Sequence, residues 1–210
     1  FSKHKSSFYS AFIFSLCELF IYNCGYVLLP IFGSDTDVIL YGFWMRAFLV
    51  MVMLLRIIID VKMHSIVEIF FSFNSKVAYR KLFSLIYVTT SAYLLFSGVF
   101  YCLMPLLDEL WFKEFSLNTD HFIFTVIFFG FLNIIIHAIG SLWLSIKVNY
   151  RFLRNSSVFA ALGIGVSVLI ASRMHITFFW PIITTYAIYF LAYLVVLNNL
   201  VSSKSVKKNI

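Results

Sequence analysis

The chain has 210 residues, of which 62% are hydrophobic and only 12% are charged. Ordinary soluble domains carry roughly 45–50% apolar and about 25% charged residues. A soluble domain of this length could not hide so much apolar surface, because too large a share of its residues must face water. The composition therefore predicts an integral membrane protein and argues against a soluble enzyme.

The net charge of +7 and the three cysteines do not indicate nucleic acid or metal. The basic residues cluster between long apolar runs, whereas a nucleic-acid-binding surface carries them along one helix or sheet. In a membrane protein such clusters are topology signals and contacts to anionic headgroups. Cys17, Cys24 and Cys102 lie inside apolar runs without a CxxC or Cys/His spacing, so we expect small buried side chains. The sequence predicts no nucleic-acid partner, no metal site and no cofactor.

Long apolar runs recur along the whole chain. A bilayer core of roughly 30 Å needs about 20 apolar residues in a helix, and continuous runs exclude the alternating pattern of transmembrane strands. We therefore predict an all-α membrane protein in which residues 1–210 form a single six-helix transmembrane domain. The expected spans are about 8–32, 38–59, 82–106, 121–146, 156–170 and 176–200.

A further helix is expected between the second and third spans. The segment 66–80 mixes apolar residues such as Ile66 and Phe70 with charged ones such as Glu68 and Arg80. This pattern predicts an amphipathic helix that lies on the cytoplasmic surface of the membrane.

The loops alternate in charge. Basic residues lie before the first span, in the second and fourth loops and after the last span: Lys3, Lys5, Lys62, Lys76, Arg80, Lys81, Lys147, Arg151, Arg154, Lys204, Lys207 and Lys208. Acidic residues dominate the first and third loops: Asp35, Asp37, Asp108, Glu109, Glu114 and Asp120. Cytoplasmic loops carry the excess of lysine and arginine, so we expect both termini in the cytoplasm, with the fifth loop and its Arg173 as the exception. A start at Phe1 without a signal-peptide pattern is compatible with an interior point of a longer protein.

Charged residues within the spans are candidate functional residues, because burial of charge in a membrane is costly. Glu18 lies near the middle of the first span, and Arg46 lies about eight residues from the outer end of the second. Their depths differ by about 6–9 Å, within the combined reach of two long side chains. Two interpretations stay open: an ion pair between the two helices, or an Arg46 that lines a polar cavity and meets an anionic substrate. A local ion pair or snorkelling explains Arg56 and Asp60, which lie four residues apart.

A polar stripe runs along the fourth span, where Gly130, Asn133, His137 and Ser141 recur every three or four residues. The stripe faces either a helix-packing seam or a water-filled cavity. A lone histidine in such a seam is more often hydrogen-bonded than a proton relay or a ligand. No residue is predicted to be catalytic, and the candidate substrate-binding or cavity residues are Arg46, Glu18, Asn133, His137 and Arg56.

Three stretches carry a resemblance to a known family. They are the helix from Phe8 through the turn 33–37 to Tyr41-Gly42 and Arg46, the segment 79–82 with the span that ends at Pro105, and the helix 132–146 with the loop 147–151. Their order resembles the C-terminal six-helix half of a bacterial polysaccharide flippase. This is the Wzx-like branch of the multidrug/oligosaccharidyl-lipid/polysaccharide exporter superfamily, and the resemblance covers nearly the whole chain.

The resemblance implies one lobe of a two-lobed transporter in a bacterial inner membrane. A companion N-terminal half of six helices would complete a cavity that opens alternately to each side. The substrate would be an undecaprenyl-diphosphate-linked oligosaccharide used for surface polysaccharide or O-antigen synthesis, with a polysaccharide polymerase and glycosyltransferases as possible partners. Arg46, and less strongly Arg56, would meet the substrate's diphosphate, as bidentate guanidinium chemistry allows.

Other functions stay open at this point. A membrane acyltransferase that modifies surface sugars would use His137 as its catalytic residue. A small-molecule exporter could share the same fold, because fold does not fix substrate. A non-catalytic membrane scaffold would have no polar cavity.

Overall fold

The computed structural model contains six α-helices and, within the residues that it describes, no strand. The described residues are 2–32, 35–72, 75–111, 120–147, 150–174 and 179–205. The helices are α1 (Ser2–Phe32), α2 (Asp35–Phe71), α3 (Ser75–Trp111), α4 (Asp120–Lys147), α5 (Tyr150–Met174) and α6 (Phe179–Ser205). The prediction of an all-α chain is confirmed for these residues. Glu114, Lys207 and Lys208, used above to predict the topology, lie outside them.

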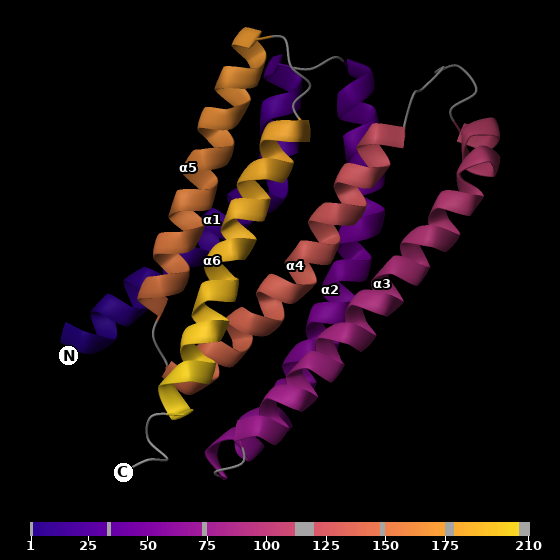
Figure 1. Cartoon of the computed structure of the whole chain (residues 1–210). Coiled ribbons are helices and arrows are strands. Elements are labelled where there is room, and N and C mark those ends of the chain that lie inside the picture. The colour runs from indigo at the N-terminus through magenta and orange to yellow at the C-terminus, as the bar shows by residue number, and fades with distance from the viewer. Residues whose placement is uncertain are drawn as a thin grey trace.

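The six helices alternate in direction along the bundle (Figure 1). α1 begins, and α2, α4 and α6 finish, at the same end of the bundle, which is the lower end in Figure 1. The first turns of α3 and α5, which carry basic residues such as Arg80 and Arg151, lie at that same end. The structure thus gathers the basic segments at one end of the bundle.

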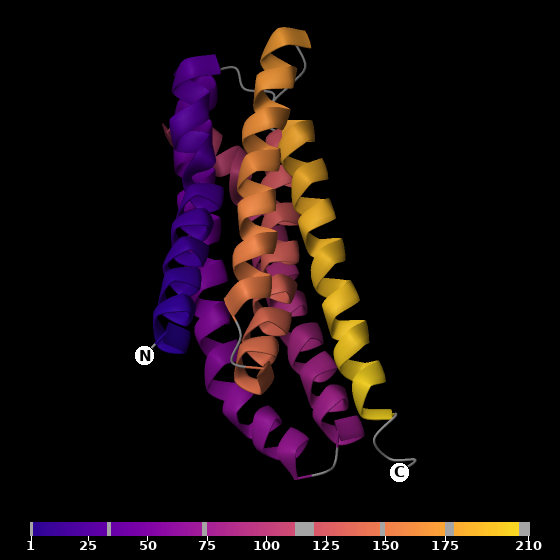
Figure 2. The ribbon, with the colours of Figure 1, turned by 90° about the vertical axis from the view of Figure 1, so that its left-hand side faces the viewer.

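α4 is the central helix, since it packs against α2, α3 and α6. α5 packs on α6 and α1, and α1 packs mainly on α5 and only sparsely on α2 (Figures 1 and 2). A helix that is apolar on all sides is expected in an interior. The described side chains of α4 agree with this, because large residues are buried around its circumference: Phe129, Leu132, Ile134, Ile136, Ile139 and Leu142.

One continuous stripe of buried side chains explains the length of α2. Its members recur every three or four residues on the face toward the bundle: Met45, Phe48, Val52, Leu55, Ile59, Met63, Ile66 and Phe70. No proline interrupts the helix, so α2 runs over 37 residues.

The segment 66–80 is therefore not a separate surface helix, which corrects the prediction. Its first part continues α2 to Phe71, and its second part begins α3 at Ser75. The amphipathic pattern is real, but its apolar face packs within the protein: Ile66, Phe70 and Ala78 are buried, and the rings of Phe70 and Tyr79 meet edge to face at 5.9 Å.

Within the described part of the chain, two helices are long and apolar enough to cross a membrane, by length and composition. They are Lys76–Leu103 in α3 and Ile127–Ile146 in α4, which overlap two of the expected spans. Such a helix can also be the core of a soluble protein, but only 28% of the most apolar stretch of α3 is buried, against 56% for α4. The apolar face of α3 is therefore largely outside the core.

The other outer helices also expose large apolar side chains. Examples on α1, α2, α3, α5 and α6 are at least 60% exposed: Phe8, Leu19, Val61, Leu95, Phe159 and Val195. On the central α4, by contrast, Phe128 is the one exposed large apolar side chain within the described residues, and it is 40% exposed. Scattered apolar residues are normal on a soluble protein, but a surface of this extent indicates apolar surroundings or large interfaces.

A glycine permits the close approach of α3 and α4. A Cβ atom added to Gly130 would overlap the ring and hydroxyl of Tyr93, which is 0% exposed. The small residue at position 130 of the polar stripe is therefore a packing requirement.

We expect Gly130→Ala to lower the free energy of unfolding by about 1–3 kcal/mol, the usual cost of overpacking a core. The melting temperature in detergent would fall accordingly. Gly98→Ala is the matched control: a Cβ there meets nothing within 4 Å, and alanine favours the helix. Adding Tyr93→Phe to Gly130→Ala should restore part of the loss, and an unchanged melting temperature for Gly130→Ala would contradict the assignment.

Candidate functional site

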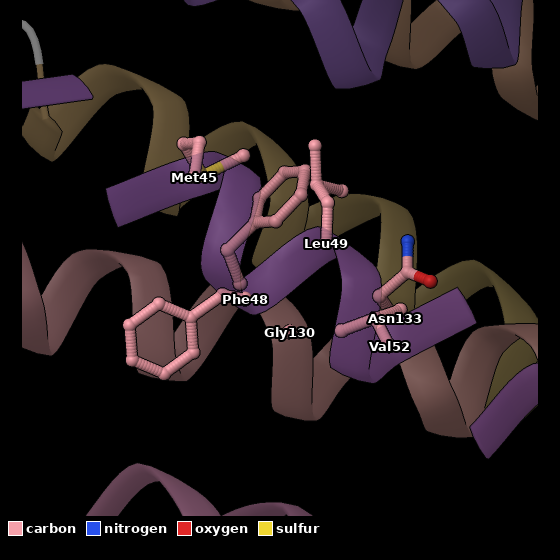
Figure 3. A pocket seen from close by; sticks show the side chains of 7 residues that line it. Met45, Phe48, Leu49, Val52, Gly130 and Asn133 are labelled. Atoms are coloured by element: carbon pink, nitrogen blue, oxygen red, sulfur yellow. The ribbon is translucent and has the colours of Figure 1, made fainter. Parts of the chain in front are cut away.

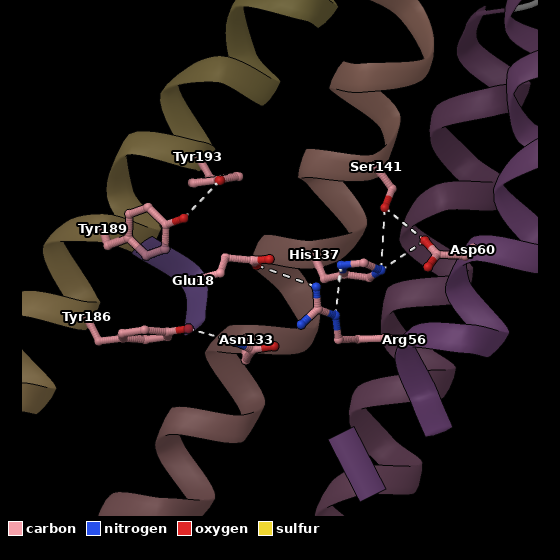
Figure 4. Close-up of polar contacts among 9 residues, drawn as sticks. All are labelled: Glu18, Arg56, Asp60, Asn133, His137, Ser141, Tyr186, Tyr189 and Tyr193. Atoms are coloured by element: carbon pink, nitrogen blue, oxygen red, sulfur yellow. Dashed lines mark hydrogen bonds and ion pairs between the residues drawn. The ribbon is translucent and has the colours of Figure 1, made fainter. Parts of the chain in front are cut away.

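Arg56 is the centre of a charged cluster inside the bundle (Figure 4). Its Nε donates a hydrogen bond to Nδ1 of His137 at 3.0 Å, and its Nη2 donates to Oε1 of Glu18 at 3.5 Å. The side chains of Arg56 and Glu18 are only 22% and 27% exposed. One guanidinium therefore connects α2 with both α1 and α4.

His137 continues the cluster from Arg56 to Asp60. Because Nδ1 accepts a hydrogen bond from Arg56, that nitrogen carries no proton, and the proton of the neutral ring resides on Nε2. Nε2 then donates to Oδ1 of Asp60 at 2.9 Å, and the hydroxyl of Ser141 donates to the same oxygen at 3.0 Å. The hydrogen-bond pattern thus assigns a neutral imidazole between a cation and an anion.

The charges of the cluster are arranged by depth. Arg56 lies between two carboxylates, and an opposite charge reduces the cost of placing a cation among apolar helices. The side chain of Asp60 is 55% exposed, whereas that of His137 is 16% exposed. The cluster is therefore most buried at His137 and reaches the surface of the bundle at Asp60.

A second polar group lies on the other side of Glu18. Asn133 Nδ2 donates to the hydroxyl of Tyr186 at 2.6 Å, and the hydroxyls of Tyr189 and Tyr193 lie 3.1 Å apart. All four residues are buried. Figure 4 shows Glu18 between these tyrosines and Arg56, so α6 also faces the charged cluster.

No family model, curated protein or solved structure matches the chain. The assignment of roles consequently depends on the residues and their geometry.

Of the two interpretations left open for Arg46, the ion pair with Glu18 is wrong, because Arg56 is the partner of Glu18. Ten residues separate the two arginines, which rotates them roughly 80° apart around α2. Arg56 therefore faces α1 and α4, while Arg46 is exposed and contacts the ring of Tyr26 at 6.0 Å. The difference in depth along the helices allowed contact between Glu18 and Arg46, but the rotation of α2 decided the partner.

The other sequence-based candidates come together. Glu18, Arg56 and His137 form one cluster, and Asn133 joins Tyr186 one turn away from His137. His137 is hydrogen-bonded to two residues of α2, as was expected of a lone histidine on this stripe. Arg56 and Asp60, for which a local ion pair or snorkelling was expected, are both hydrogen-bonded to His137 of α4, which lies between them.

The tyrosines of α6 were missed by the sequence analysis. Tyr186, Tyr189 and Tyr193 lie three and four residues apart, so they share one helix face. Their spacing was a visible signal, but tyrosine is also common in membrane helices and the apolar context hid it.

A small cavity lies beside Asn133 of the second polar group. It measures about 10 Å³, lies between α2 and α4, and is lined mostly by apolar side chains with Asn133 at one edge (Figure 3). This volume is about the minimum for one water molecule. Among the described residues, no group of three or more His, Cys, Asp or Glu is placed to hold a metal ion.

A double-mutant cycle tests the ion pair. We expect Glu18→Gln and Arg56→Gln to be non-additive in the free energy of unfolding by about 1 kcal/mol, because each variant removes the same contact. Chemical denaturation in mixed micelles measures this coupling.

Arg46→Gln provides the matched control for that cycle. Combined with Glu18→Gln it should be additive within about 0.5 kcal/mol, because the two side chains have different partners. Coupling of Glu18 to Arg46 in place of Arg56 would refute the observed pairing.

Proposed function

We propose that this chain is one lobe of a membrane transporter that flips an undecaprenyl-diphosphate-linked oligosaccharide by alternating access. The observation that carries the proposal is the Arg56 cluster: a charged network joins three helices inside a bundle whose outer face is apolar. Ionisable residues within membrane bundles commonly mark transport pathways or switches.

The apolar exterior supports embedding of all six helices in a bacterial inner membrane. α1, α2, α3, α5 and α6 expose large apolar side chains, and α4 packs against three of these helices. The common end that carries Arg80, Arg151 and both termini would face the cytoplasm, because cytoplasmic ends are rich in lysine and arginine.

The packing supports two conformations of the lobe. α1 meets α2 sparsely, and two described polar contacts join them: the 3.5 Å contact of Glu18 with Arg56 and the 3.2 Å bond from the Tyr26 hydroxyl to the Gly42 carbonyl. α2 and α4 pack closely and share the 3.0 Å bond from Arg56 to His137. Transport by alternating access requires a bundle with two states of similar free energy. Release of Glu18 would let α1 and α5 move relative to α2 and α4.

The substrate and partners of the proposal come from the resemblance. They are the lipid-linked oligosaccharide, a companion six-helix half, and the polymerase and glycosyltransferases of surface polysaccharide synthesis. The resemblance also implies that Arg46 binds the diphosphate of the substrate. Arg46 is exposed and lies outside the Arg56 cluster.

The geometry of His137 does not favour an acyltransferase. In a Ser-His-Asp arrangement one ring nitrogen faces the nucleophile and the other faces the carboxylate. Here Asp60 and Ser141 both lie on the Nε2 side, at 2.9 and 3.5 Å, and Arg56 occupies Nδ1. No ring nitrogen is left to activate Ser141 in this arrangement.

Bacteria that depend on this protein for surface polysaccharide provide the test. We expect Arg56→Gln to lower surface polysaccharide at least about fivefold, because the switch loses its coupling between helices. Lipid-linked oligosaccharide should accumulate on the cytoplasmic leaflet, with normal protein levels in the membrane. Glu18→Gln should act in the same direction.

Lys62→Gln is the control, since Lys62 is an exposed lysine six residues farther along α2. It should leave polysaccharide at the wild-type amount. Normal polysaccharide with Arg56→Gln would remove the cluster from transport, and loss of acyl groups from otherwise normal polysaccharide would favour the acyltransferase.

A further inference from the structure

An open groove lies between α1 and α2, away from the Arg56 cluster. Its volume is about 550 Å³, within the range of roughly 300–1,000 Å³ that ligand sites occupy. Tyr26 contributes from α1, and the other lining residues belong to α2: Val38, Ile39, Gly42, Phe43, Arg46 and Ala47. The groove therefore combines one guanidinium with aromatic and aliphatic walls.

The charge of Arg46 is not neutralised by any described residue. Arg46 is exposed and makes no ion pair or hydrogen bond with the described side chains. The nearest acidic positions on α2, Asp35 and Asp37, lie at least about 13 Å away along the helix axis. A cation beside apolar walls is stabilised by an anion that comes to it, so the groove is suited to an anionic ligand.

Tyr26 gives the groove a defined wall. Its hydroxyl donates to the backbone carbonyl of Gly42 at 3.2 Å, which fixes the ring against α2. The guanidinium of Arg46 lies over that ring at 6.0 Å, the outer limit of a cation–π contact. This contact leaves the guanidinium hydrogen-bond donors available to a ligand.

The surroundings favour an amphiphile over a soluble anion. Val27 and Ile31 of α1 and Ile39 and Val50 of α2 are exposed apolar residues near the groove in sequence. The apolar part of α2 begins at Val38, and Arg46 lies about 12 Å farther along the helix axis. A long arginine side chain can extend from this depth toward the polar end of the helix. Lipid phosphates can approach an arginine at this depth because the bilayer thins locally.

We propose that the Arg46–Tyr26 groove binds an anionic phospholipid of the surrounding bilayer, with its phosphate on the guanidinium of Arg46 and its first acyl carbons on Val38, Ile39 and Phe43. A planar guanidinium binds a phosphate through two parallel hydrogen bonds. This site is independent of the proposed transport function, since it requires only that α1 and α2 lie in a membrane.

Lipid binding to the full chain, purified in a neutral detergent, tests the proposal. Native mass spectrometry would measure phosphatidylglycerol and phosphatidylcholine binding side by side. We expect a preference for phosphatidylglycerol that Arg46→Gln reduces about tenfold, as loss of a charge-assisted contact does. Gly42→Leu, which fills the groove without changing its charge, should weaken the same binding.

Arg173→Gln is the matched control, because Arg173 is another exposed arginine near a helix end but outside the groove. It should retain the preference for phosphatidylglycerol. An unchanged preference in Arg46→Gln would overturn the site. Displacement of phosphatidylglycerol by inorganic phosphate, or by undecaprenyl phosphate at a tenfold lower concentration, would also overturn it and assign the groove to a soluble anion or to a transported lipid.

Discussion

A guanidinium held among apolar helices constrains the rest of this structure. Arg56 needs partners on several sides, and α1 and α4 supply them as Glu18 and His137. These contacts fix the rotation of α2, because the same helix must direct its buried apolar stripe toward the bundle and Arg56 toward both neighbours.

The interior is organised in two adjoining polar groups with different chemistry. The Arg56 group contains charges and reaches the surface at Asp60, which is 55% exposed. The tyrosine group on α6 is buried and uncharged, and its hydroxyls pair with Asn133 and with one another. Glu18 lies between the two groups (Figure 4), so a movement of α1 would change the surroundings of both.

Two arginines on one helix have opposite environments. Arg56 is partly buried and bound by residues of two other helices, whereas Arg46 is exposed beside an open groove. The first is suited to hold or release helices, and the second is suited to bind an anion from outside. A difference of ten residues along α2 produces this division, because it rotates the two side chains onto different faces.

The sequence by itself determined the all-α class, the approximate positions of the helices, the polar stripe of α4 and the candidates Glu18, Arg56 and His137. These features follow from apolar run length and helical spacing, which are local properties of the chain. Tertiary structure decided that Glu18 pairs with Arg56, that His137 bridges Arg56 and Asp60, and that the segment 66–80 belongs to α2 and α3. These outcomes depend on how helices rotate, tilt and pack against one another, and a pattern read along one helix contains no information on its neighbours.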